Sequence, residues 1–233
     1  MVMYDDNAYY AYPHIEQQRA ALLRSTTEVQ QTDYGTGGGG SSPRVVTRKV
    51  ADIARTHLES PKVGQLLFRL VNYLTSTLQR PLTIVELGTS LGVTTAYLAS
   101  PSPKNTVQTY EGAGEVLDVA MKVWRTLELQ NIEPVAGNID QTLADHQPKS
   151  VDIAYIDANH TCEATLRYFR QLLGAVKPHS IVVVDDIHHS PEMEQAWRAI
   201  QQTEQVTSTI DCYSVGLVFF NKHYIRKHYR MRI

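Results

Sequence analysis

Residues 85–99, VELGTSLGVTTAYLA, decide the fold of this chain. They join a buried apolar strand at residues 82–87 to a helix that runs through Ala99, and glycines stand at Gly88 and Gly92 in the turn between them. Glycine at such a turn lets the backbone approach a ligand closely. A strand, a glycine turn and a helix in this order predict the first unit of an α/β sheet.

The alternation of strands and helices continues to the end of the chain. Because the central strands are apolar throughout, they predict a parallel sheet covered by helices on both faces. The last two strands are joined too tightly for a crossover helix, so we expect that pair to be antiparallel. The further strands are expected at residues 106–111, 131–136, 151–157, 181–185, 205–211 and 214–220, and the helices at residues 115–129, 141–146, 163–176 and 191–202.

The chain before residue 82 has a different composition. Residues 1–13 carry no pattern, so we expect a loose start there. Residues 14–30 predict a short polar helix, and residues 44–58 and 61–78 predict two more. Between the first and second of these helices, residues 35–43 are rich in glycine and serine, which favours a flexible hinge. A phosphate-binding loop is the weaker alternative, because no strand is predicted before the segment. We expect residues 1–43 to be an extension and residues 44–233 to be the main domain.

Composition excludes several classes of protein. The net charge of −2 argues against a nucleic-acid coat or a membrane-surface protein, both of which need a positive field. Cys162 and Cys212 show no metal-type spacing, so neither a disulfide framework nor a zinc site is predicted. The first residues lack the basic start and apolar run of a signal peptide, and no apolar stretch is long enough for a membrane span. We therefore expect a cytoplasmic protein.

Acidic residues follow the first two strands of the sheet. Glu86 stands two positions before Gly88, and Glu111 ends the second strand. The spacing E-x-G-x-x-x-G departs from the dinucleotide motif G-x-G-x-x-G. A carboxylate here suits a cationic ligand such as a sulfonium that carries an ammonium, while one at Glu111 can accept both hydroxyls of a ribose. The alternative is a tight structural turn with an incidental glutamate.

A second acidic cluster is predicted at the ends of the fourth and fifth strands, where Asp157, Asp185 and Asp186 stand. Neighbouring parallel strands end side by side, so these carboxylates should converge. Buried like charges repel unless they are protonated or neutralised, and Mg²⁺, which prefers oxygen ligands, would neutralise them. Helix capping is the alternative for Asp157 and Asp186, but it does not account for Asp185.

The stretches VELGTSLGVTTAYLA and VQTYEG resemble the class I S-adenosylmethionine-dependent methyltransferases. The resemblance implies a Rossmann-like, seven-stranded sheet with strand order 3-2-1-4-5-7-6, the last strand antiparallel, preceded by an N-terminal helical extension. It also implies a cofactor site whose methionine end is lined by Glu86, Gly88, Thr89, Ser90 and Gly92. The resemblance places Glu111 and Gly112 at the ribose and Asn138 at the adenine, with Asp157 also at the cofactor.

Within that superfamily the chain resembles the cation-dependent, catechol-type O-methyltransferases. The resemblance implies that Asp157 and Asp185 are metal ligands, with Asp186 where the family has asparagine. His160 falls at the position of the family's lysine base, and neutral histidine can serve as a general base. His188 is a second candidate for the base.

The resemblance implies an enzyme that transfers a methyl group from S-adenosylmethionine to a hydroxyl of a small molecule, assisted by Mg²⁺. A homodimer is common among similar enzymes. Two rival readings share the fold: an NAD-dependent oxidoreductase, which would need the dinucleotide glycine spacing, and a non-catalytic module that binds the adenosyl ligand.

Overall fold

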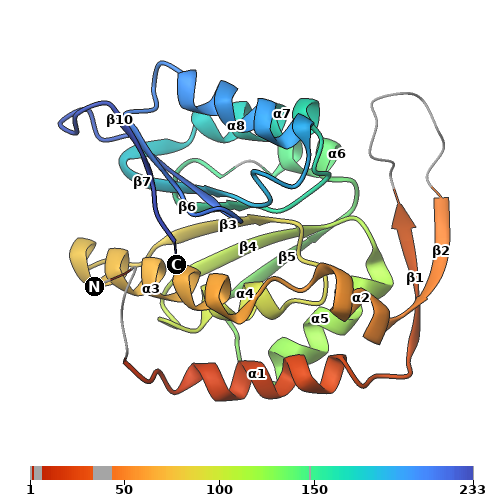
Figure 1. Ribbon diagram of the computed structural model, residues 1–233. Coiled ribbons are helices and arrows are strands. Elements are labelled where there is room, and N and C mark those ends of the chain that lie inside the picture. The colour runs from red at the N-terminus through yellow and green to blue at the C-terminus, as the bar shows by residue number, and fades with distance from the viewer. Residues whose placement is uncertain (1, 3–6, 34–43, 147, 233) are drawn as a thin grey trace.

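The computed structural model describes residues 2, 7–33, 44–146 and 148–232 (Figure 1). Its centre is an eight-stranded sheet with strand order β10-β8-β9-β7-β6-β3-β4-β5, and a separate two-stranded sheet is formed by β1 and β2. The strands are β1 (Glu28–Asp33), β2 (Arg44–Lys49), β3 (Thr83–Leu87), β4 (Thr106–Glu111), β5 (Ile132–Ala136), β6 (Val151–Ile156), β7 (Val176–Val184), β8 (Ser208–Asp211), β9 (Gly216–Phe219) and β10 (Lys227–Arg230).

The topology of the large sheet is the one predicted. Read from β5 to β8, the seven strands have the order 3-2-1-4-5-7-6, and β9 is antiparallel to both of its neighbours while the other pairs are parallel. The eighth strand, β10, had no counterpart in the prediction. It pairs in parallel with β8, with Lys227 opposite Ser208, and forms an exposed edge of the sheet.

Helices cover both faces of the sheet, as Figure 1 shows, with α6, α7 and α8 on one face and α1, α3, α4 and α5 on the other. The cause is the alternation of side chains along each strand. Val85 and Leu87 pack with α7 and α8, while Ile84, the residue before Val85, packs with α3. The helices are α1 (Ala11–Leu22), α2 (Val50–His57), α3 (Pro61–Leu78), α4 (Val93–Ala99), α5 (Gly114–Thr126), α6 (Ile139–Asp145), α7 (Cys162–Leu173) and α8 (Pro191–Gln202).

The N-terminal predictions were wrong in two places. The helix expected at residues 14–30 ends at Leu22 and gives way to β1, and the helix expected at residues 44–58 begins only at Val50, after β2. The strands β1 and β2 pair antiparallel from Glu28 opposite Lys49 to Asp33 opposite Arg44. This pairing satisfies backbone groups that a helix would have satisfied locally. The predicted hinge at residues 35–43 lies outside the described residues.

The expected loose start at residues 1–13 was also wrong from Tyr9 onward. Tyr9 and Tyr12 pack against Phe68 of α3, with ring centroids 4.8 and 5.1 Å away. Helix α1 is held further by the Tyr97 hydroxyl, which donates to the Glu16 carboxylate at 2.7 Å. Helix α1 and Tyr9 just before it are therefore packed onto α3 and α4. Among the described residues, no helix is both long and apolar enough to cross a membrane.

Candidate functional site

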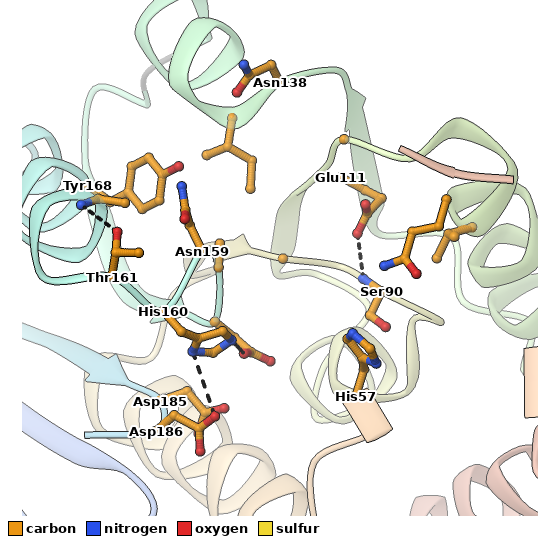
Figure 2. Close-up of a pocket in the computed structure, with 18 of the residues that line it drawn as sticks. His57, Ser90, Glu111, Asn138, Asn159, His160, Thr161, Tyr168, Asp185 and Asp186 are labelled. Carbon is orange, nitrogen blue, oxygen red and sulfur yellow. Dashed lines mark hydrogen bonds and ion pairs between the residues drawn. The ribbon is translucent and has the colours of Figure 1, made fainter. Parts of the chain in front are cut away.

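A pocket of about 790 Å³ opens at the carboxyl ends of β3, β4, β6 and β7, with residues of β1, β2 and α2 lining its other wall (Figure 2). This is the edge where open α/β sheets bind ligands. Most of the residues that the sequence predicted for the site line this pocket: Gly88, Ser90, Glu111, Gly112, Asn138, Asp157, His160, Asp185 and Asp186. The lining does not include Glu86, Thr89, Gly92 or His188.

The turn between β3 and α4 depends on its two glycines for different reasons. Gly88 has φ +99°, and a Cβ there would lie 1.9 Å from the carbonyl oxygen of Asp157. Gly92 has φ +77°, and a Cβ there would lie 2.5 Å from the indole nitrogen of Trp124, which donates to the Gly92 carbonyl. Gly88 therefore allows two strand ends to meet at the pocket, whereas Gly92 allows α4 to pack on α5.

Glu111 lies at the end of β4 and faces the turn, as Figure 2 shows. Its carboxylate accepts hydrogen bonds from the backbone N–H of Ser90 and of Ala113, both at 2.8 Å. Burial raises the pKa of Glu111 above its ordinary value, against the opposing effect of these N–H donors. The carboxylate thus fixes the backbone of the turn while facing the pocket.

Glu86 lies beneath the turn and is fully buried. Its Oε2 accepts hydrogen bonds from Thr95 at 2.5 Å and Thr109 at 2.6 Å, and the Thr109 hydroxyl also contacts Thr89. Burial raises the pKa of Glu86 to about 8. Glu86 and Thr89 therefore support the turn from below.

The far end of the pocket is formed by α6 and α7. Asn138 is the N-cap of α6, and its side-chain oxygen accepts from the Asp140 N–H at 3.0 Å. Asn159 and Tyr168 lie on the opposite side of this end (Figure 2). The Asn159 Oδ1 is buried with no hydrogen-bond partner in the described part of the chain.

The second acidic cluster does converge at one end of the pocket, around His160. The His160 Nε2 lies 3.3 Å from Asp157 Oδ1, and its Nδ1 lies 3.7 Å from Asp186 Oδ2. Burial of His160 disfavours its charged form, but the hydrogen bond with Asp157 and the charges of Asp157 and Asp186 outweigh it, so its pKa is raised. Asp185 is 5% exposed, and burial, followed by the charges of Asp157 and Glu59, raises its pKa well above the ordinary value.

The predicted magnesium ligands do not fit a metal site as they are arranged. A divalent cation needs several oxygen atoms around one point. The Asp157 and Asp186 carboxylates instead face the two nitrogens of His160, and Asp186 also lies 3.8 Å from His189 Nδ1. Among the residues that the structure describes, no group of three or more His, Cys, Asp or Glu side chains could hold a metal ion.

His188 is separated from the other predicted residues. It lies in a different cavity with Asp211, Glu194 and Arg230, and its Nε2 is 3.0 Å from Asp211 Oδ2. Its neighbours Asp186 and His189 both line the first pocket, so only the His188 side chain points away from it. This placement does not support His188 as the base.

Sequence reasoning missed several residues of the pocket wall. His57 ends α2 and Glu59 follows it, while Arg48 lies on β2 and His189 follows β7. The side chain of Glu59 is hydrogen-bonded to that of Asp185. Burial and the charge of Arg48 lower the pKa of His57. The H-x-E spacing of His57 and Glu59, at the end of the first of two predicted helices, was the one local signal.

The sequence comparisons agree with this geometry. Residues 85–187 match the model of a family described as a methyltransferase domain. This span contains the β3–α4 turn, Glu111 and the acidic cluster. A search of curated protein sequences finds no significant match.

Solved structures with the same fold include three methyltransferases. An O-methyltransferase from Bacillus cereus in complex with S-adenosylhomocysteine is 18% identical, with a TM-score of 0.63 over 92% of each chain. A methyltransferase from Podospora anserina, also bound to S-adenosylhomocysteine, is 12% identical, with a TM-score of 0.64 over 91% of this chain and 88% of that one. An O-methyltransferase from Streptomyces achromogenes, involved in tomaymycin synthesis and bound to S-adenosylmethionine, is 20% identical, with a TM-score of 0.58 over 70% and 82%.

The strand order, the glycine turn and the acidic end of β4 together define the fold of a class I S-adenosylmethionine-dependent methyltransferase. Within that fold, residues 85–187 are the part of the chain that matches the methyltransferase-domain model.

Proposed function

We propose that the chain is an enzyme that transfers the methyl group of S-adenosylmethionine to a hydroxyl group of a small molecule. The observation that carries this proposal is the Glu111 carboxylate, which faces the pocket beside the glycine turn. A carboxylate at this strand end can accept hydrogen bonds from both hydroxyls of a ribose. The cofactors bound to solved proteins of the same fold support the same ligand here.

The residues of the pocket fit this cofactor. Gly88, where the Asp157 carbonyl packs in place of a side chain, would line the methionine end next to Ser90. Glu111 and Gly112 would hold the ribose, and the amide nitrogen of Asn138 would donate to the adenine. When bound, the cofactor supplies an electrophilic methyl group on a sulfonium.

We assign His160 as the general base. If the Nε2 proton points to Asp157 at 3.3 Å, then Nδ1 carries the lone pair. That Nδ1 is buried and has no hydrogen-bond partner among the described residues. Asp157 thus orients the imidazole, and Nδ1 takes the proton of the acceptor hydroxyl. His160→Gln should abolish methyl transfer while the affinity for S-adenosylhomocysteine stays at the wild-type value; turnover at the wild-type rate would remove His160 from this role.

The sequence predicts assistance by Mg²⁺, whereas the mechanism above uses no step through a metal. Because the carboxylates face an imidazole rather than a common point, we expect the rate of methyl transfer to be the same in EDTA as in Mg²⁺. A rate that falls in EDTA and returns with Mg²⁺ would instead support Asp157, Asp185 and Asp186 as ligands.

The proposal is tested first by titration calorimetry with S-adenosylhomocysteine, using NAD as the comparison ligand. We expect the adenosyl ligand to bind and NAD to give no heat. Binding of NAD alone would favour the oxidoreductase. Binding of the adenosyl ligand without turnover of any acceptor would favour the non-catalytic module.

The remaining expectations concern partners and location. The net charge of −2 supports a small molecule, rather than a nucleic acid, as the partner. A homodimer and a cytoplasmic location stay predictions, and light scattering of the purified chain tests the first of them.

A further inference from the structure

One end of the pocket, around His160 and Asp185, is where the substrate hydroxyl is expected. Two buried hydrogen-bond acceptors at this end lack donors. Asp185 is 5% exposed and lines the pocket, and its Oδ1 has no hydrogen-bond partner in the described ranges. The Nδ1 of His160, next to it, is in the same condition. A buried polar atom without a hydrogen-bond partner is destabilising. A ligand at this end should therefore bring donors to both atoms.

The walls around these atoms are chiefly polar. Glu59 is hydrogen-bonded to Asp185, and the His189 ring lies 6.2 Å from the His160 ring. His57 faces His160 from across the pocket in Figure 2, and its Nδ1 contacts the Thr56 hydroxyl at 2.6 Å. Leu58 is an apolar exception in the same wall. An aromatic acceptor would need apolar faces on both sides of its ring, and this end offers few.

Part of the acidic charge at this end is neutralised within the protein. A hydrogen bond between the Glu59 and Asp185 carboxyl groups requires a proton on one of them. The site therefore calls for hydrogen-bond donors more than for a cation. A saturated ring that carries hydroxyl groups can donate hydrogen bonds in several directions without bringing a charge.

We propose that the acceptor is a saturated polyol of monosaccharide size, held by one hydroxyl on Asp185 and another on His160. This inference rests on the proposed function and narrows its substrate class. In the reaction the hydroxyl facing His160 gives its proton to Nδ1, and its oxygen bonds to the methyl carbon as the carbon–sulfur bond breaks. The products are a methyl ether and S-adenosylhomocysteine.

The experiment is saturation-transfer NMR on the protein saturated with S-adenosylhomocysteine, in EDTA. The probes are the methyl pyranosides of glucose, galactose and mannose, with catechol and 1,4-diaminobutane as comparisons. We expect transfer to at least one pyranoside and none to the other two probes. In Asp185→Leu the affinity for that pyranoside should fall roughly tenfold, since a hydrogen bond to a buried carboxyl oxygen is lost. Asp185→Asn, which keeps a carbonyl oxygen, should recover part of the signal.

Asp118→Asn, on the exposed face of α5, is the matched control and should behave as wild type. The inference is overturned if none of the three pyranosides shows saturation transfer, or if catechol or the diamine gives a stronger signal. A pyranoside signal that appears only when Mg²⁺ is added also overturns it, because direct hydrogen bonding needs no metal. Calorimetry with S-adenosylhomocysteine on the same samples separates the two failures: if that ligand binds and the pyranosides do not, only the substrate class is wrong.

Discussion

Replacing Glu111 by alanine tests the assignment of the cofactor pocket most directly. The carboxylate accepts two backbone N–H groups, from Ser90 and Ala113, and faces the place where the ribose is expected. The change removes the charged acceptor for the ribose hydroxyls and also releases the turn. Both effects should weaken binding of S-adenosylhomocysteine.

The magnitude follows from the number and kind of hydrogen bonds. A hydrogen bond to a charged group contributes about 1.5–3 kcal/mol net. If the ribose loses one such bond, the dissociation constant rises by roughly 10- to 150-fold, since 1.4 kcal/mol is a factor of ten. Glu111→Gln should lie between wild type and alanine, because its single carbonyl oxygen can accept from only part of the same set of donors.

The assay is titration calorimetry with S-adenosylhomocysteine, paired with thermal unfolding of each variant. Unfolding is needed because the loss of the Ser90 and Ala113 bonds can also lower stability. Glu133→Ala, on the exposed face of β5, is the control and should bind as wild type does. A well-folded Glu111→Ala protein that binds the ligand within about twofold of wild type, or less than about 0.4 kcal/mol weaker, would refute the assignment.

Two further predictions concern stability. Gly88→Ala should cost at least about 2 kcal/mol, because φ is +99° and the new Cβ would lie 1.9 Å from the Asp157 carbonyl oxygen; a wild-type melting temperature would contradict this. Arg80→Ala should cost about 1–3 kcal/mol at pH 7, since two hydrogen bonds to Asp152, at 2.7 and 2.9 Å, are lost. Burial alone would raise the pKa of Asp152, but hydrogen bonds from Arg80, Thr83 and His179 lower it. This stabilisation is present above the carboxyl's unfolded pKa and is lost as the pH falls through the lower folded pKa, so the two proteins should converge in acid urea titrations.

The sequence by itself determined the main sheet. Its central strands are runs of buried apolar residues, and each lies between helices whose polar and apolar positions alternate with a helical period. Such patterns depend on local burial, so they can be read without knowing the neighbours. The turn at Gly88 and the acidic residue at Glu111 could also be predicted, because each stands at the end of a predicted strand.

The β1–β2 pair could not be predicted from the sequence. Val46 and Val50 have the spacing of a helix, yet residues 44–49 form a strand because they pair with residues 28–33. The stability of a strand depends on the neighbouring strand in the sheet, which can be distant in sequence. No local sequence pattern identifies that neighbouring strand. The same holds for β10, whose four residues are all exposed.

Which side chains share the pocket was decided by the tertiary structure. His188 stands three residues after Asp185, yet its side chain contacts Asp211 in a different cavity. Glu59 is separated from Asp185 by more than half the chain, yet the packing of α3 against the sheet brings the two side chains together. Sequence spacing determines which face of a strand or helix a side chain occupies, but contacts between elements depend on how the whole chain packs.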